Sequence, residues 1–249
     1  MENIIDKHIQ RLVNDGEEVP AGIWQANELF KDEIMLVLFN ADIKIDCPES
    51  IAHMRLKTKA DWEWADEHFE ERIGGVPTNP GESYKRWPYA TFKEDDDFMD
   101  GKQFSHTYQE RFWPKSVVYP FKGIRYEFGD LEDVIQQLIN NPLTRQAYLP
   151  IFFPEDTGAV HKQRVPCTLG YQFWIHKGSL HMNYYIRSCD ALRHFRNDIY
   201  LAMRLMYHMG TRVSHIKRLG YMNMYITNFH VFKNDLYALK KKETKLSKP

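Results

Sequence analysis

Four side chains between residues 164 and 200 carry functional groups that suit chemistry on a small anionic ligand. Cys167 can supply a thiolate nucleophile, Arg187 and Ser188 can bind an anion, and Asp198 offers carboxylate oxygens as hydrogen-bond acceptors. The planar fork of an arginine matches phosphate oxygens, and a neighbouring hydroxyl adds one more donor. The pattern predicts a nucleophile, an anion clamp and an acceptor on one short stretch of chain.

Each of these residues also has a plainer interpretation, which the cysteines illustrate. A lone cysteine is most often a small buried side chain, and this is our interpretation of Cys47 and Cys189. Cys167 differs because Arg164 and the region of Arg187 could supply the positive potential that favours a thiolate. A single arginine is most often one half of a surface ion pair, so the predicted anion site depends on the whole group.

Hydrophobic periodicity predicts the elements that position this group. Two strands, about 168–176 and 179–187, flank a turn at Lys177-Gly178. A helix over about 197–209 follows, with apolar residues at helical spacing and Gly210 at its end. The candidate residues therefore belong to one strand–turn–strand–helix unit.

The rest of the chain predicts one α+β domain. Expected elements are a helix over 1–14, a strand over 33–46, a helix with breaks from 49 to 71, a loop over 74–81, a helix over 131–140 capped by Asp130, a strand over 148–153, a strand over 221–227 and a helix or turn over 228–239. We expect a mixed β-sheet packed by helices over residues 1–239. A basic, polar tail over 240–249 should be frayed.

Overall composition excludes several classes of protein. The 33 basic and 34 acidic residues leave a formal net charge of −1, so no global field attracts nucleic acid or anionic lipid. Three cysteines without a CxxC pair indicate a reducing compartment and predict neither a structural disulfide nor a metal site. No leader-like start and no apolar run long enough for a bilayer are visible. We expect a cytoplasmic protein, in the host cytoplasm if it is viral.

The acidic stretch over residues 94–102 is expected to be a solvated loop. A calcium site is the alternative interpretation. It is the weaker one, because the spacing of the acidic residues differs from that of an EF-hand.

The order and spacing of several motifs resemble the thymidylate synthase family. They are Pro166-Cys167, Tyr171-Gln172-Phe173, Arg187-Ser188 followed by Asp190, and Asp198 eight positions later. The resemblance is strongest over about 140–232 and weak before residue 100. It implies a homodimer that pairs through its sheet and an enzyme that takes a one-carbon unit from 5,10-methylenetetrahydrofolate, without a metal.

Details within these motifs resemble the phage deoxycytidylate (dCMP) hydroxymethylase branch of the family. Thr168 follows the cysteine where thymidylate synthases usually have histidine, and Ile186 precedes the arginine where they have glutamine. The segment 195–198 resembles the hydroxymethylase version. Asp198 stands where thymidylate synthases place an asparagine that binds uracil.

The aspartate has a physical interpretation in terms of the base. An asparagine offers one donor and one acceptor, which match N3–H and O4 of uracil, whereas a carboxylate offers acceptors alone. Acceptors match the 4-amino group and a protonated N3 of cytosine, so Asp198 favours a cytosine nucleotide such as dCMP. The plainer alternative is that Asp198 caps the helix over 197–209.

The resemblance also implies a mechanism. Cys167 would add to C6 of the pyrimidine, and C5 would then attack the methylene group of the folate. Loss of tetrahydrofolate would leave an exocyclic methylene, which a hydroxymethylase hydrates with water and a synthase reduces by hydride. In this mechanism Arg187 and Ser188 bind the phosphate, and Arg145 reaches the phosphate of the partner subunit's site. Asn197 and Gln172 belong with Asp198 to the substrate site, and His230 binds the sugar hydroxyl. Asp190 contacts the pterin, and Tyr108 assists proton transfer.

Three positions depart from the family pattern. Gln146 stands in place of the second phosphate arginine, and Phe232 in place of a sugar-binding tyrosine. The catalytic glutamate of the family aligns with Asp61, with Glu63 as the nearby substitute. These departures leave alternatives open: a thymidylate synthase, a dUMP or CMP hydroxymethylase, or a non-catalytic binding or scaffold member.

Overall fold

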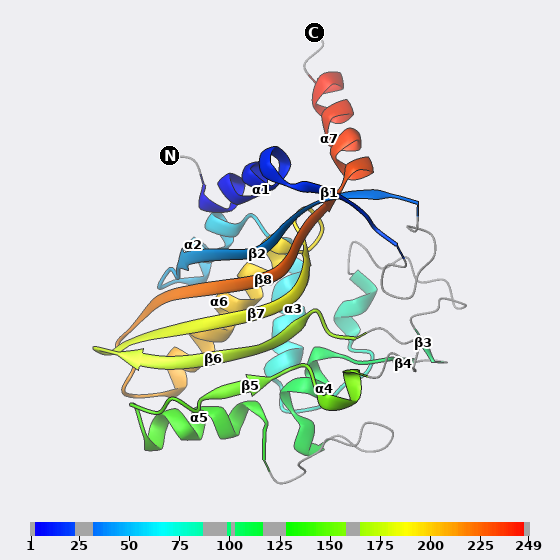
Figure 1. Cartoon of the computed structure of the whole chain (residues 1–249). Coiled ribbons are helices and arrows are strands. Elements are labelled where there is room, and N and C mark those ends of the chain that lie inside the picture. Colours follow the sequence, from blue (N-terminus) through cyan, green and yellow to red (C-terminus); the bar gives the residue numbers. More distant parts are fainter. Residues whose placement is uncertain are drawn as a thin grey trace.

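The computed structural model describes residues 3–22, 32–86, 99–100, 103–116, 128–157 and 165–246. These residues form a six-stranded mixed sheet with helices packed against it (Figure 1). The helices are α1 (Ile4–Asp15), α2 (Ile51–Thr58), α3 (Trp62–Ile73), α4 (Tyr108–Phe112), α5 (Leu131–Asn140), α6 (Phe195–Arg212) and α7 (Lys233–Leu246). The strands are β1 (Glu17–Pro20), β2 (Ile34–Asp46), β3 (Met99–Asp100), β4 (Gln103–Phe104), β5 (Tyr148–Pro150), β6 (Thr168–His176), β7 (Ser179–Asp190) and β8 (Arg218–Phe232). The predicted α+β fold is confirmed.

The sheet has the strand order β1-β2-β8-β7-β6-β5, and β3 and β4 form a separate small ribbon. β7 and β8 are parallel, and the other neighbours in the large sheet are antiparallel. A parallel pair needs a crossover connection, which α6 provides between β7 and β8. The crossover therefore brings the first turn of α6 beside the ends of both central strands.

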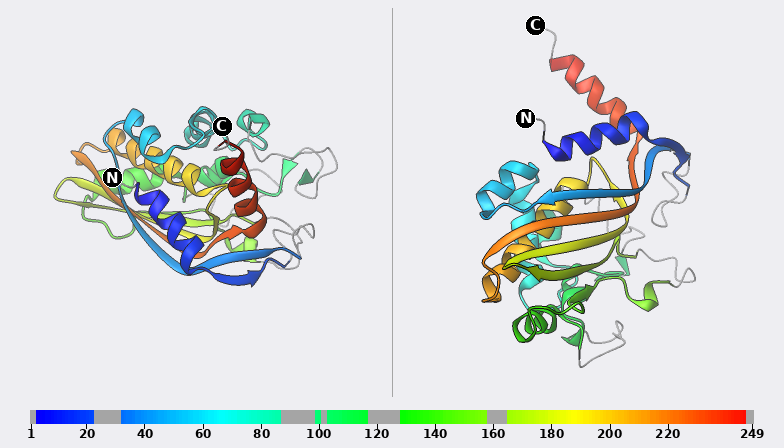
Figure 2. Two further views of the ribbon diagram at one scale, coloured as in Figure 1. Left: turned by 90° about the horizontal axis from the view of Figure 1, so that it is seen from above. Right: turned by 60° about the vertical axis from the view of Figure 1, so that its left-hand side comes forward.

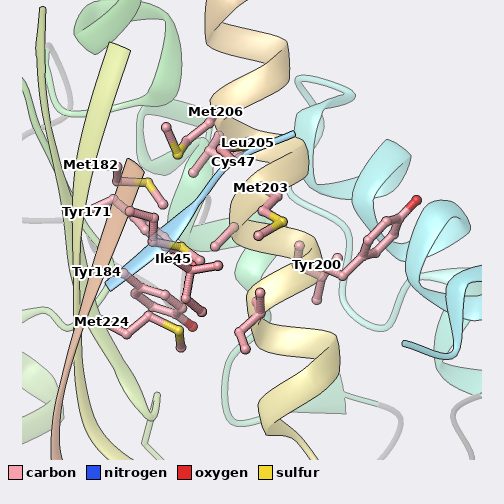
Figure 3. Close-up of a cluster of buried hydrophobic side chains, with 14 of the residues drawn as sticks. Ile45, Cys47, Tyr171, Met182, Tyr184, Tyr200, Met203, Leu205, Met206 and Met224 are labelled. Atoms are coloured by element: carbon pink, nitrogen blue, oxygen red, sulfur yellow. The ribbon is translucent and has the colours of Figure 1, made fainter. Parts of the chain in front are cut away.

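The main core lies between the sheet and α6. Alternation along β7 directs Leu180, Met182, Tyr184 and Ile186 into this core, as their spacing predicts. Figure 3 shows Met182 and Met224 from the sheet facing Met203 and Met206 of α6. Flexible methionines fill the irregular space between a twisted sheet and a helix. Cys47 lies in the same cluster, which confirms its interpretation as a core residue.

Local signals explain several element boundaries. Asp130 accepts a hydrogen bond from the backbone of Asp133, whose side chain bonds back to the Asp130 backbone, so the predicted cap of α5 is confirmed as a capping box. Lys177 and Gly178 both have positive φ, 49° and 74°, and form the two-residue turn between β6 and β7. Residues 59–61 separate α2 from α3, and the non-helical residues 74–81 follow α3.

The C-terminal expectations need correction. β8 continues to Phe232, so residues 228–232, predicted as helix or turn, are strand. Their side chains are largely buried against the sheet neighbours, and this tertiary pairing outweighs local propensity. α7 begins at Lys233 and continues to Leu246, so most of the tail predicted to be frayed is helical. Figure 2 shows α7 projecting from the end of β8.

The two faces of the sheet differ. α2, α3 and α6 lie on one face (Figure 2). The opposite face, called here the outer face, carries Gln172, Trp174, His181, Tyr185 and Tyr225, which alternate with core residues along their strands. Trp174 stacks on His181 with ring centroids 5.4 Å apart, and Tyr185 stacks on Tyr225 at 5.5 Å.

Two further expectations concern the acidic loop and membrane-spanning helices. The predicted acidic loop over 94–102 falls mostly outside the described residues, and only its residues 99–100 are seen, in β3. Within the described ranges, each helix is too short or too polar to cross a lipid bilayer.

Candidate active site

An open cavity of about 1170 Å³, its mouth included, lies beside the N-terminal end of α6 and the C-terminal ends of β7 and β8. α3 and α4 form its other walls. Residues expected from the sequence to act together line it, namely Tyr108, Cys167, Ser188, Asp190, Asn197, Asp198 and His230. The cavity is open to solvent and combines several convergent polar groups with aromatic walls, which is typical of a small-molecule site.

Cys167 lies directly before β6, partly exposed to the cavity. Arg187 holds the chain in front of it: its Nε donates to the carbonyl of Pro166 at 2.8 Å and its Nη2 to that of Val165 at 2.9 Å. The same Nη2 lies 3.8 Å from Cys167 Sγ. The guanidinium thus supplies the expected positive charge beside the sulfur. Arg164, the other expected source, lies outside the described residues.

Asp198 lies in the first turn of α6, which begins at Phe195. The alternative that Asp198 caps this helix is therefore wrong, because the capping position is His194. Instead, the carboxylate lines the cavity, and Cys189 Sγ lies 3.6 Å from Asp198 Oδ2. Cys189 is buried as expected, but it also lines the cavity.

The residues before Asp198 anchor this end of α6 to the other helices. Arg196 pairs with Asp6 of α1 and donates from Nη1 to the carbonyl of Thr58 at 3.1 Å. Asn197 Oδ1 accepts a hydrogen bond from the backbone N–H of Asp61 at 2.9 Å. This amide oxygen holds the start of α3, whereas the carboxylate of Asp198, whose Oδ2 accepts a hydrogen bond from Cys189 Sγ, lines the cavity.

Burial raises the pKa of Asp198 to about 6, although the Arg72 cation acts to lower it. The folded state therefore holds this proton more tightly than the unfolded chain, whose ordinary pKa is 3.8. The protonated Asp198 carboxyl therefore contributes most to stability below pH 3.8, the pKa of the unfolded chain. This contribution is lost as the pH rises through about 6, the pKa in the folded state. At neutral pH the cavity contains an ionised, partly desolvated carboxylate.

We predict that Asp198→Asn becomes more stable relative to the wild type as the pH rises from 4 to 7. The gain should reach about 2–3 kcal/mol, because an amide never carries the buried charge. Urea unfolding of both proteins at several pH values measures it. A stability difference that does not change with pH would contradict the raised pKa.

A chain of hydroxyl groups leads from Tyr108, which lines the cavity, into the core. Tyr108 OH lies 2.9 Å from Thr168 Oγ1, which lies 2.9 Å from Tyr184 OH. Burial raises the pKa of Tyr108, so its hydroxyl stays protonated. Thr107 and Glu110 form a capping box that fixes the helix carrying Tyr108. A protonated phenol next to the residue that follows Cys167 is suited to assist proton transfer.

Asp190 and His230 are register partners at the ends of β7 and β8, and both are buried. Asp190 Oδ1 accepts hydrogen bonds from the backbones of Leu192 and Arg193, each at 3.0 Å, and so shapes the turn before α6. Burial lowers the pKa of His230, which the Asp190 charge opposes. His230 Nε2 is buried without a hydrogen-bond partner among the described residues, which suits a ligand group in the cavity.

Comparison with known proteins decides the family. The thymidylate synthase family model matches residues 50–249, which is most of the chain. The chain belongs to the thymidylate synthase family. The predicted family membership is confirmed, and the match extends well before residue 100, where the motif resemblance is weak.

Two individual relatives agree with this membership. A thymidylate synthase of Mycoplasma pneumoniae is 23% identical over 175 residues, which cover 68% of this chain and 58% of that protein. A thermostable thymidylate synthase A from Bacillus subtilis is similar in structure with a TM-score of 0.68 and 16% identity, covering 95% of this chain and 81% of that one. This likeness shows a thymidylate synthase-like fold. The chain spans less than two thirds of the length of the Mycoplasma relative.

The structure does not bring every expected family residue to the cavity. Gln172 lies on the outer face, where its Oε1 accepts a hydrogen bond from Tyr185 OH at 3.2 Å. It alternates with Tyr171 and Phe173, whose side chains fill the core, so it points to the other side of the sheet. Arg145 and Gln146 are exposed in the loop between α5 and β5, outside the cavity lining of their own chain.

The two acidic residues expected to replace the family glutamate are also elsewhere. Asp61 and Glu63 are exposed at the start of α3 and do not line the cavity. α3 instead directs Trp64, His68 and Arg72 toward the cavity. Spacing of four residues places these three on one helix face, and that spacing was the available signal. Sequence reasoning missed them because it followed the carboxylates.

The cavity fits the folate that the family implies. Aromatic walls such as Trp64 and Phe104 offer surfaces for a pterin ring. Asp190 lines the same cavity, as a pterin contact would require. Among the described residues, no group of three or more His, Cys, Asp or Glu side chains is arranged to hold a metal ion.

Proposed function

We propose that this protein is a folate-dependent hydroxymethylase that converts dCMP to 5-hydroxymethyl-dCMP. The single observation that carries the proposal is the carboxylate of Asp198 in the cavity that Cys167 also lines. Family membership supports one-carbon transfer to a pyrimidine nucleotide. The identity of the base then depends on which hydrogen-bonding groups meet it.

Asp198 selects cytosine through its charge. An ionised carboxylate accepts from the 4-amino group and from a protonated N3, whereas it meets O4 of uracil as acceptor against acceptor. Unpaired or opposed polar groups in a desolvated pocket cost about 1–3 kcal/mol each. Asn197, the neighbouring amide, uses its oxygen on the Asp61 backbone. The cytosine base is therefore the better partner for this turn of α6.

The chain's own residues carry the remaining steps. Cys167 adds to C6 of the base, with the Arg187 guanidinium 3.8 Å from the sulfur favouring the thiolate. Ser188 and Arg187 contribute to phosphate binding, and His230 offers its buried Nε2 to the sugar. Tyr108, through Thr168, assists proton transfer near the nucleophile. When bound, 5,10-methylenetetrahydrofolate supplies the one-carbon unit to C5, with Asp190 beside the pterin.

We also propose that the protein is a homodimer that pairs through the outer face of its sheet. Stacked aromatic side chains on that face, such as Trp174 with His181 and Tyr185 with Tyr225, suit an interface better than solvent. Arg145 then reaches the phosphate site of the partner subunit, which accounts for its position outside its own cavity.

An assay with formaldehyde, tetrahydrofolate and one nucleotide at a time tests the proposed activity. We expect 5-hydroxymethyl-dCMP from dCMP, without dihydrofolate, and much slower turnover of dUMP and CMP. Methylated product with dihydrofolate would identify a synthase instead. Turnover of dUMP alone would overturn the role of Asp198, and binding without turnover of any nucleotide would identify a non-catalytic member.

A further inference from the structure

Arg72 of α3 is a buried cation that forms no ion pair with another described residue. It lines the cavity and is 6% exposed. Among the described residues, no carboxylate lies within ion-pair distance of its guanidinium, and its Nε is buried without a hydrogen-bond partner. The Asp198 carboxylate in the same cavity interacts with this charge from beyond ion-pair distance, so a ligand that brings negative charge closer to the guanidinium would compensate it further.

A relay of hydrogen bonds holds this guanidinium in place. Arg72 Nη2 lies 2.9 Å from His68 Nε2, and His68 Nδ1 lies 3.0 Å from Ser83 Oγ. Ser83 Oγ donates in turn to Glu71 Oε2 at 2.6 Å, and Gln109 donates to the same oxygen at 2.8 Å. Because arginine only donates, His68 Nε2 accepts, and the imidazole is neutral with its proton on Nδ1.

The protonation states agree with this relay. Burial, followed by the Arg72 cation, lowers the pKa of His68 to about 4. Burial acts to raise the pKa of Glu71, but hydrogen bonds from His68, Ser83 and Gln109 lower it to about 2. The relay therefore runs from a cation through two neutral groups to an anion. Its geometry fixes Arg72, which also lines the cavity.

Contacts place Arg72 beside the reacting part of the cavity. Its guanidinium lies over the ring of Tyr108, 4.0 Å from the centroid. Tyr108 OH bonds to Thr168, which follows the candidate nucleophile directly. The Arg72 charge also acts to lower the pKa of Asp198, the candidate base-binding residue. The Arg193 charge instead acts to lower the pKa values of Asp190 and His230. These contacts place Arg72 near the residue that follows the nucleophile and in the cavity that Asp198 also lines.

The geometry points to Arg72 as the residue that stabilises negative charge on the pyrimidine ring when Cys167 adds to C6, with His68, Ser83 and Glu71 as positioning residues. This inference rests on the proposed function. As the S–C6 bond forms to a ring whose N3 is not yet protonated, the C5=C6 π bond breaks, and its electron pair moves to C5 and the conjugated heteroatom, N3 in cytosine or O4 in uracil. N3 of cytosine takes up from solvent the proton that Asp198 faces as this charge develops. The thiol proton has already left to solvent. A fixed cation lowers the energy of this ring anion more than that of the neutral ring.

Exchange of tritium from C5 of labelled dCMP into water tests the inference, with tetrahydrofolate present and formaldehyde withheld. We expect Arg72→Gln to lower kcat for exchange by about 10²–10³-fold, while KM changes less than about threefold, because the neutral ring gains little from the cation. Arg204→Gln is the matched control. Arg204 is also buried, but it pairs with Asp66 and Glu70 of α3 and does not line the cavity, so its loss should leave kcat unchanged.

A second variant covers the case in which Arg72→Gln does not fold. Ser83→Ala removes only the hydroxyl that links His68 to Glu71, and we expect it to lower kcat about tenfold with KM nearly unchanged. If the wild-type protein exchanges tritium, two outcomes overturn this inference and leave the proposed function intact. One is a kcat in Arg72→Gln equal to that of the wild type or, if this variant does not fold, an equal kcat in Ser83→Ala. The other is a rise in KM without a change in kcat. Absence of exchange by the wild-type protein with both dCMP and dUMP overturns the proposed function as well.

Discussion

Replacing Cys167 with alanine should abolish exchange of the C5 hydrogen of dCMP, with a loss of at least about 10⁴-fold. The exchange requires a covalent bond to C6, and among the described residues that line the cavity no other group is as suitable a nucleophile. Cys167 is partly exposed to the cavity, with the Arg187 guanidinium 3.8 Å from its sulfur. Tritium release from labelled dCMP, measured in the wild type and the variant, gives the ratio directly.

Of the other two cysteines, Cys47 serves as the control and Cys189 is the alternative candidate for the nucleophile. Cys47 is buried in the core, where desolvation raises its pKa to about 12, so Cys47→Ala should leave exchange unchanged. Cys189 lines the cavity, but burial raises its pKa well above the ordinary value and disfavours a thiolate. Exchange that survives in Cys167→Ala and is lost in Cys189→Ala would show that the nucleophile is misassigned.

Asp198→Asn should shift the base preference from cytosine toward uracil. We expect kcat/KM for dCMP to fall and that for dUMP to rise, changing their ratio by about 10²–10⁴-fold. An amide can donate to O4 and accept from N3–H, which a carboxylate cannot do. Because asparagine has nearly the same shape as aspartate, a change in this ratio reports on the hydrogen-bonding character and charge of the side chain rather than on its size. Steady-state kinetics with both nucleotides measures the ratio.

A carboxylate outside the cavity provides the comparison for this substitution. Asp235 pairs with Arg193 at the start of α7 and does not line the cavity, so Asp235→Asn should leave the ratio unchanged. A folded Asp198→Asn protein that keeps the wild-type preference for dCMP would remove Asp198 from base selection. The family assignment would stand in that case, since it depends on other residues.

Much of the fold could be predicted because it depends on local pattern. The spacing of Met203 and Met206 predicts a buried helix face, and alternation along residues 179–187 predicts a half-buried strand; both are confirmed. The strand end at Phe232 could not be predicted, because residues 228–232 are held by neighbours distant in sequence. Pairing with β2 and β7 outweighs the local turn signals there.

The sequence by itself determined the family and the main set of polar residues, since motif order along the chain carries that information. Only the tertiary structure decided which of them meet. It brought Cys167 and Asp198 to one cavity and placed Gln172 on the opposite face of the sheet. It also revealed Arg72 as a buried cation in the cavity, because the cost of a buried charge depends on what surrounds it in space.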